Sequence, residues 1–226
     1  MNYLIIGLGN FGSSLAIKLT QLGHEVIGVD KSMEKVETYK DDITHTVCLD
    51  CSDVHAAKNL PVKDTDAVII CIGENEGESI MATALMKQLK VKRIISRAVS
   101  TLQETIINAM GIEEIVHPEM DSAERLARVL NTEGYIDSFK LTDDYSIVKV
   151  KVPEKYEGKT LGQLNLRNDF KLTVLTTIRT VQKRNIIGVK RNIVEVTEVA
   201  NADTVLNKNE IMVIYGHVKD IERFWG

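Results

Sequence analysis

Gly7-Leu8-Gly9-Asn10-Phe11-Gly12 is the stretch of this chain that decides its fold. It has the spacing G-x-G-x-x-G, it follows an apolar run directly, and it opens a helical pattern from Ser13 to Leu22. A second apolar run then ends in an acid, Asp30, 18 residues beyond Gly12. A glycine-rich turn between a strand and a helix, followed by an acid at the end of the next strand, predicts a Rossmann unit that binds a nucleotide.

The residue types of the motif match the needs of a phosphate site. Gly7 permits the tight turn, Gly9 lets a phosphate approach the backbone, and Gly12 lets helix and strand pack closely. The first N–H groups of the helix lie at its positive end, where phosphates bind. Asp30 would accept hydrogen bonds from ribose hydroxyls, and its charge disfavours a 2′-phosphate and hence NADP. The alternative is a glycine-rich turn without a ligand.

The first 134 residues alternate apolar runs with amphipathic stretches. The strand candidates are 3–6, 25–29, 46–49, 67–72, 93–96 and 114–116. Helical patterns lie between them, and glycines such as Gly23 and Gly111 stand at turn positions. This alternation predicts a doubly wound α/β domain with a parallel sheet, covering residues 1–134.

Ligands of such sheets bind beyond the carboxyl ends of the strands. The ends of the third and fourth strand candidates therefore supply contacts for the base, and Asp50 could accept from the adenine amino group. The alternative makes Asp50 or Asp53 a helix cap. We add Lys31, which follows Asp30, and Arg97, which follows the fifth strand candidate. The candidate nucleotide contacts are Gly7, Gly9, Asn10, Phe11, Gly12, Asp30, Lys31, Asp50, Cys51, Ile72, Gly73, Glu74 and Arg97.

The pattern changes after about Tyr135. Ser146, Val148, Val150 and Val152 fall on one face of a period-2 pattern. Further strand candidates are 172–178, 186–189, 193–199 and 211–215, with helical patterns at 161–166 and 218–224. Clustered strands with few helices predict a second, smaller α+β domain over residues 135–226.

Composition and charge exclude several classes of protein. Hydrophobic residues make up 44% and charged residues 27% of the 226 residues, as in ordinary globular proteins. No apolar run approaches the roughly 20 residues that cross a bilayer. Residues 1–134 hold 13 Lys and Arg against 20 Asp and Glu, a net charge of −7, and the remainder holds 15 against 12, a net of +3. Without a dense basic stripe, nucleic acid is not the expected partner. Three cysteines and no basic leader indicate a cytoplasmic protein.

Other motifs carry weaker signals. Cys48-Leu49-Asp50-Cys51 has C-x-x-C spacing without a second pair for zinc, which leaves a redox pair as an alternative. Gly158-Lys159-Thr160 resembles the end of a phosphate-binding P-loop, but Pro153 stands where that loop needs glycine. We find no acid–base or hydride-transfer constellation and expect no enzyme. An NAD-dependent oxidoreductase is the alternative function.

These motifs together resemble the TrkA/KtrA-type regulators of bacterial potassium transport, which consist of an RCK-N (KTN) and an RCK-C (TrkA-C) domain. Gly7-Leu8-Gly9-Asn10-Phe11-Gly12 is similar to the G-L-G-x-F-G of the Ktr branch. The resemblance covers nearly the whole chain. The other similar stretches are His24-Glu25-Val26, Val29-Asp30, His117-Pro118-Glu119-Met120-Asp121, Asp144-Tyr145-Ser146-Ile147-Val148, Val213-Ile214-Tyr215-Gly216-His217 and Asp220-Ile221-Glu222-Arg223-Phe224.

The resemblance implies a cytosolic homo-octameric ring, formed from dimers and docked on a potassium-translocating membrane subunit of the Trk/Ktr type. It implies that exchange of NADH or ATP against NAD or ADP changes gating. Glu119 matches a residue that helps hold a divalent cation such as Mg²⁺ at the ATP phosphates; a helix-dipole partner is the alternative. The second domain of some relatives binds cyclic di-AMP, and Arg167 lies in a similar stretch, where a surface arginine is the alternative.

One residue departs from the family pattern. Close Ktr relatives often carry Arg where this chain has Asn10, and that Arg reaches the terminal phosphate of a neighbouring subunit's nucleotide. Asparagine has no charge to offer a phosphate. The departure therefore weakens the expected discrimination of ATP from ADP and makes NAD(H) or ADP more plausible.

Overall fold

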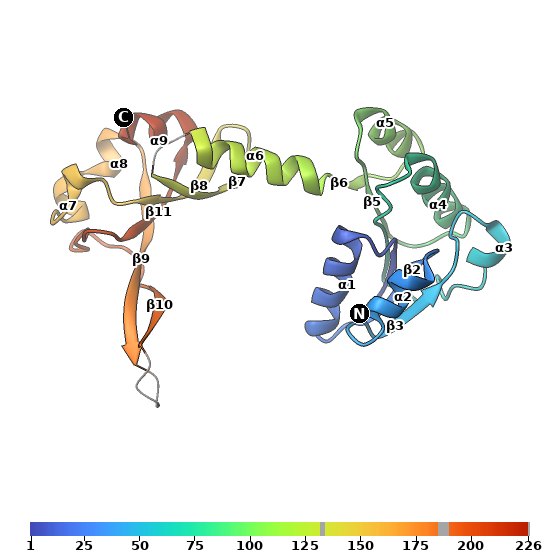
Figure 1. Cartoon of the computed structure of the whole chain (residues 1–226). Coiled ribbons are helices and arrows are strands. Elements are labelled where there is room, and N and C mark those ends of the chain that lie inside the picture. The colour runs from blue at the N-terminus through green and yellow to red at the C-terminus, as the bar shows by residue number, and fades with distance from the viewer. Residues whose placement is uncertain (132–133, 185–189, 226) are drawn as a thin grey trace. The chain divides into compact units, whose positions relative to one another are not determined.

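The computed structural model describes residues 1–131, 134–184 and 190–225, which form two compact units, Met1–Met120 and Asp121–Gly226. They are called the first and the second unit below, and Figure 1 labels their elements. The helix α6 (Pro118–Asn131) begins at the end of the first unit and continues into the second. The domain boundary between residues 134 and 135, which follows this helix, stays a prediction.

The first unit is a doubly wound α/β structure, as the alternating pattern predicts. Its six parallel strands have the order β3-β2-β1-β4-β5-β6. The strand order reverses between β1 and β4, and such a reversal opens a crevice at the carboxyl ends of the strands. The elements are β1 (Asn2–Ile6), α1 (Asn10–Gln21), β2 (Glu25–Asp30), α2 (Met33–Tyr39), β3 (His45–Cys48), α3 (Val54–Ala57), β4 (Ala67–Ile70), α4 (Glu76–Gln88), β5 (Ile94–Arg97), α5 (Thr101–Ala109) and β6 (Glu114–Val116).

The core of the first unit has a layer on each face of the sheet, because strand side chains alternate between faces. Leu4 and Ile6 of β1 pack in a cluster with residues of α3, α4 and α5, whereas Ile5 packs in a second cluster with Ala16 of α1. β4 ends at Ile70, two residues earlier than its apolar run predicts. Cys71 and Ile72 thereby leave the strand at the edge where the crevice opens.

The second unit is an antiparallel sheet with helices, and the α+β prediction is confirmed. The strand order is β10-β9-β11-β8-β7. Figure 1 shows β9 and β10 running beyond the other strands of this sheet. The elements are β7 (Tyr135–Lys140), β8 (Tyr145–Lys151), the 3-10 turn η1 (Glu154–Tyr156), α7 (Leu161–Leu164), α8 (Leu166–Asp169), β9 (Thr173–Arg184), β10 (Lys190–Val196), β11 (Ile211–His217) and α9 (Val218–Trp225).

The local predictions for the second unit have mixed outcomes. β8 buries Ser146, Val148 and Val150 on one face, as its period-2 pattern predicts. The single helix predicted at 161–166 is wrong, because Asn165 has a left-handed backbone (φ 47°) that divides it into α7 and α8. β7 was not predicted. The strand candidate at 186–189 lies outside the described residues.

Candidate functional site

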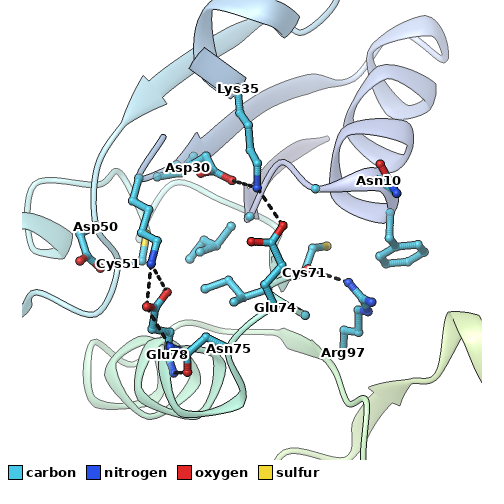
Figure 2. Close-up of a pocket in the computed structure, with 18 of the residues that line it drawn as sticks. Asn10, Asp30, Lys35, Asp50, Cys51, Cys71, Glu74, Asn75, Glu78 and Arg97 are labelled. Carbon is cyan, nitrogen blue, oxygen red and sulfur yellow. Dashed lines mark hydrogen bonds and ion pairs between the residues drawn. The ribbon is translucent and has the colours of Figure 1, made fainter. Parts of the chain in front are cut away.

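A cavity of about 480 Å³ opens at the carboxyl ends of the parallel strands in the first unit. Figure 2 shows its lining side chains converging from both halves of the sheet. All the candidate nucleotide contacts named from the sequence line it except Gly12, and Glu119 lines it as well. The remaining lining residues are Ile6, Val29, Lys35, Leu49, Cys71, Asn75 and Glu78. The sequence candidates therefore gather at one place, although their contacts with a nucleotide stay a prediction.

The glycine-rich loop leaves the start of α1 open to this cavity. Gly7 has a φ of +97°, which favours glycine, and Gly9 is the N-cap residue of α1. Within the described residues, no side chain caps α1, and its first turn carries no acid. The helices α2 to α5 are capped by side chains, which belong to Ser32, Asp53, Asn75 and Ser100. The first N–H groups of α1 therefore have no side-chain acceptor in the described part of the chain, a geometry that suits the binding of an anion.

Gly12 and Gly9 are glycines for different reasons. A Cβ at Gly12 would overlap the carbonyl oxygen of Gly7, so Gly12 lets α1 pack against the turn that follows β1. A Cβ at Gly9 would meet no described atom within 4 Å. The φ of Gly9 is −71°, which any residue adopts. The fold itself therefore does not require glycine at position 9.

Asp30 is fixed by two backbone donors. Its Oδ2 accepts from the Leu8 N–H at 2.7 Å, and its Oδ1 accepts from the Ser32 N–H at 2.9 Å. The side chain is 9% exposed. Each carboxylate oxygen keeps a second lone pair, which is available to a hydroxyl group. Asp30 thus braces the glycine-rich loop and also presents an acceptor edge to the cavity.

Asp50 follows the last residue of β3 by two positions and lines the cavity on the same side as Asp30. Its Oδ1 accepts from the Ser52 N–H at 2.8 Å and from the Ser52 hydroxyl at 2.6 Å. These hydrogen bonds hold the pKa of Asp50 below its usual value, so the group is an acceptor at neutral pH. Asp53, by contrast, caps α3 through the N–H groups of His55 and Ala56. The cap alternative therefore applies to Asp53, whereas Asp50 faces the cavity.

The cysteines do not fit the redox alternative well. Cys48, Cys51 and Cys71 are all free. Burial raises the pKa of Cys51 to about 12, and burial also raises the pKa of Cys71 to about 12. The thiolate is the reactive form of cysteine, so these two thiols are poor nucleophiles at neutral pH.

Arg97 lines the cavity on the side opposite Asp50. Its Nη1 donates to the carbonyl oxygen of Cys71 at 3.2 Å, and its Nη2 forms an ion pair with Glu119. A side chain at Gly73 would overlap the guanidinium. The Nε of Arg97 is buried and has no hydrogen-bond partner among the described residues. Asn10 lies at the start of α1, on the same side of the cavity in Figure 2.

The Glu119 carboxylate forms an ion pair with Arg97 and does not belong to a cluster of metal-ligating side chains among the described residues. Across the described residues, no group of three or more His, Cys, Asp or Glu side chains is placed to hold a metal ion. A cation at Glu119 would need oxygen ligands from elsewhere, such as nucleotide phosphates. The metal assignment stays a prediction.

Sequence reasoning missed three polar residues of the cavity, Lys35, Asn75 and Glu78. Lys35 lies in the first turns of α2, just beyond Asp30, and that proximity is a signal the sequence does contain. Asn75 caps α4 through the Glu78 N–H. Glu78 reaches Lys31 across the cavity, 47 residues away in the chain, and no local pattern reveals this contact.

Two other predictions have a place in the structure. Arg167 lines a cavity of about 490 Å³ in the second unit, together with residues of α7, α8 and β9. Its ligand stays a prediction. None of the described helices is long and apolar enough to cross a membrane.

Comparison with known proteins identifies the family. Residues 3–118 match the TrkA-N domain. The chain is 32% identical to Ktr system potassium uptake protein C of Bacillus subtilis (strain 168), over 98% of this chain and 95% of the relative. It is 30% identical to Ktr system potassium uptake protein A of the same organism, over 98% of this chain and 94% of the relative.

Solved structures agree with this assignment at the level of the fold. The GsuK RCK domain aligns with a TM-score of 0.67 and 16% identity, and the alignment covers 100% of this chain and 47% of that one. A GsuK channel bound to NAD aligns with a TM-score of 0.64 and 16% identity, over 97% of this chain and 38% of that one. This chain thus spans about half of the first structure and a smaller part of the second. At this level of identity, the likeness shows the RCK fold alone. The expected family is confirmed: the chain belongs to the TrkA-N domain family, among the Ktr system potassium uptake proteins.

Proposed function

We propose that this chain is the nucleotide-binding regulatory subunit of a potassium uptake system and has no catalytic role of its own. Its ligand is an adenine nucleotide, either NAD(H) or ATP and ADP. In this proposal the ribose lies against Asp30, the base lies near Asp50 and Cys51, and the phosphates lie over Gly9 at the start of α1. A membrane subunit of the Trk/Ktr type conducts the ion.

The absence of a side chain at Gly9 is the observation that carries the proposal. The fold leaves open space where a Cβ would stand, and the backbone angles of Gly9 suit any residue. A glycine that the fold does not need is explained by a ligand that must approach the backbone closely. The uncapped N–H groups of α1 supply the donors for that ligand.

Asp50 supports adenine as the base. As a carboxylate held by Ser52 it only accepts hydrogen bonds. The exocyclic amino group of adenine is a donor, whereas guanine presents an acceptor at the equivalent ring position. A divalent cation such as Mg²⁺ fits as a companion of ATP, because Mg²⁺ binds through one or two carboxylates plus substrate phosphates, and Glu119 would be that carboxylate.

Self-association is part of the proposal. The helix α6 buries none of its residues, and its Leu126 and Leu130 side chains are 57% and 77% exposed. An apolar helix face of this kind supports packing against a second copy. We propose dimers that close into an octameric ring, at the cytoplasmic side of the membrane and attached through the conducting subunit. Light scattering should then give eight times 25.3 kDa.

Gly9→Ala tests nucleotide binding. Because the new methyl group has room in the free protein, the variant should keep the melting temperature of the wild type. It should bind ADP roughly tenfold or more weakly in calorimetry, because the methyl group obstructs the phosphates. Gly77→Ala, in α4 and outside the cavity lining, is the matched control and should bind normally. Wild-type affinity in Gly9→Ala would place the phosphates elsewhere.

Gating is tested by potassium uptake into liposomes that contain the conducting subunit. A nucleotide shifts gating only if it binds one state of the assembly better, and a coupling of about 1–3 kcal/mol changes the equilibrium about 5- to 150-fold. Flux should respond to nucleotide only when this chain is present. Potassium flux that responds neither to this chain nor to nucleotide would contradict the regulatory role. Reduction of NAD to NADH with added alcohols or hydroxy acids would favour an oxidoreductase.

A further inference from the structure

Two lysines stand beside Asp30 at the ribose end of the cavity, and each is paired with a carboxylate from the opposite wall. Lys31 follows β2 directly, and its ammonium donates to both carboxylate oxygens of Glu78, at 2.6 and 2.7 Å. Lys35 of α2 donates to Glu74 Oε1 at 3.2 Å. Figure 2 shows Lys35 and Glu74 reaching toward each other across the cavity.

The positions of the lysines matter because of the chemistry of the ribose. An acid at the end of the second strand accepts from the 2′-hydroxyl, whereas a nearby cation accommodates a 2′-phosphate. This cavity contains both kinds of group. Lys35 forms a long ion pair with Asp30 Oδ2 at 4.0 Å, beyond hydrogen-bond distance, and a closer one with Glu74 at 3.2 Å. Asp30 alone therefore does not settle which ribose this site accepts.

We infer that Glu78 and Glu74 determine this specificity by occupying the two lysines. With both ammonium groups engaged, Asp30 presents its acceptor edge, and the site selects nucleotides whose ribose carries a free 2′-hydroxyl. The inference rests on the proposed nucleotide function and adds the residues that select its ligand class. NAD(H), ATP and ADP belong to that class, and 2′-phosphorylated nucleotides do not.

The two pairs contribute unequally. The Glu78 side chain is 26% exposed and is also held by Asn75 Nδ2 at 3.1 Å, whereas the Glu74 side chain is 86% exposed. Exposed ion pairs are weak because water screens them. The pair with Glu78 therefore controls most of the specificity, and the pair with Glu74 makes a smaller contribution.

The probes are adenosine 5′-monophosphate (AMP) and adenosine 2′,5′-bisphosphate, which differ only in the 2′-phosphate. Calorimetry at one ionic strength gives the ratio of their affinities for each variant. Both probes are measured on the same preparation, so partial unfolding lowers both affinities and leaves the ratio unchanged. The wild-type chain should prefer AMP.

Glu78→Gln should narrow this preference roughly fivefold to tenfold, and Glu74→Gln roughly twofold to threefold, because each frees one ammonium for a charge-assisted contact with the 2′-phosphate. Glu76→Gln is the matched control. Glu76 lies on α4, as Glu78 does, accepts a hydrogen bond from the Ser100 hydroxyl, and does not line the cavity. Its ratio should equal that of the wild type. The Glu74→Gln/Glu78→Gln double variant should gain affinity for the bisphosphate relative to AMP. Adding Lys31→Met and Lys35→Met to it should remove this gain.

Three outcomes decide the matter. An unchanged ratio in the double variant that still binds AMP overturns the inference and leaves the proposed function intact. A gain that survives the two Lys→Met changes overturns the role of the lysines. Failure of the wild-type chain to bind AMP, ADP, ATP or NADH overturns the proposed function and the inference with it.

Discussion

The first unit places a carboxylate at the edge of its core, whereas the second unit has a cluster of aromatic rings packed around Phe224 in an otherwise aliphatic core. Asp30 is almost buried, and backbone N–H groups of Leu8 and Ser32 hold it. In the second unit, the rings of Tyr156 and Phe224 stack at 4.8 Å, and Phe170 meets Phe224 edge-on at 5.4 Å. Phe224 itself is fully buried.

The difference shows where each unit is vulnerable. A buried carboxylate depends on its hydrogen bonds, so its loss affects the loop geometry and the ligand site together. A buried aromatic ring contributes area and packing, so its loss affects stability and leaves no binding group unpaired. Substitutions in the two units should therefore separate stability from nucleotide binding.

Phe224→Ala should give the largest effect. Removing a fully buried phenylalanine destabilises a core by about 3–5 kcal/mol. The chain has one tryptophan, Trp225, in the same unit, and its fluorescence during urea unfolding reports the change. Val199→Ala, at an 84% exposed side chain, is the control. ADP affinity should stay unchanged, and a loss of stability below about 1 kcal/mol would show that this core repacks easily.

Asp30→Ala should weaken ADP binding by about 1.5–3 kcal/mol, roughly ten- to hundredfold, because charged hydrogen bonds to the ribose are lost. It should also destabilise the first unit by about 1–3 kcal/mol, because the Leu8 N–H is left without an acceptor. Calorimetry measures the first effect, and hydrogen exchange at the Leu8 amide measures the second. The exposed Asp42→Ala is the control. Weak binding with normal exchange at Leu8 would limit Asp30 to the ligand.

Asn10→Arg tests the side of the cavity on which Asn10 and Arg97 lie. If residue 10 faces the terminal phosphate, a charge-assisted contact should raise ATP affinity relative to ADP by about 1–2 kcal/mol. Competition calorimetry with both nucleotides measures the difference. Equal changes for ATP and ADP would show that residue 10 lies away from that phosphate, and Arg97 would then be the cation to examine.

Ser52→Ala should have the smallest effect. The Ser52 hydroxyl lowers the pKa of Asp50, so the variant should move this pKa back toward its ordinary value of 3.8. A lowered pKa in the folded state stabilises the protein above the unfolded pKa, and this contribution disappears as the pH falls through the folded pKa, below about pH 4. Carboxyl NMR titration follows the shift. An Asp50 pKa that does not change in Ser52→Ala would assign the lowering to another group.

The sequence by itself determined much of the architecture and one half of the site. The spacing of Gly7, Gly9 and Gly12 between two apolar runs specifies a strand, a turn and a helix. Gly7 meets a backbone demand and Gly12 a packing demand, whereas the fold does not need glycine at position 9. Alternating runs predicted the parallel sheet, and the period-2 pattern in β8 predicted its buried face. Strand ends then indicated Asp30 and Asp50, since parallel strands finish at a common edge.

Only the tertiary structure decided which side chains face each other across the cavity. Lys31 and Glu78 meet although 47 residues separate them, and Arg97 meets Glu119. Such pairs depend on the strand order β3-β2-β1-β4-β5-β6, which brings β2 and β4 to either side of β1. Periodicity specifies which face of an element is buried, and it carries no information about which element lies beside it. Asp30 let the sequence predict that a 2′-phosphate is disfavoured. The Lys31–Glu78 and Lys35–Glu74 pairs, on which the inferred ribose selection rests, had no sequence signal.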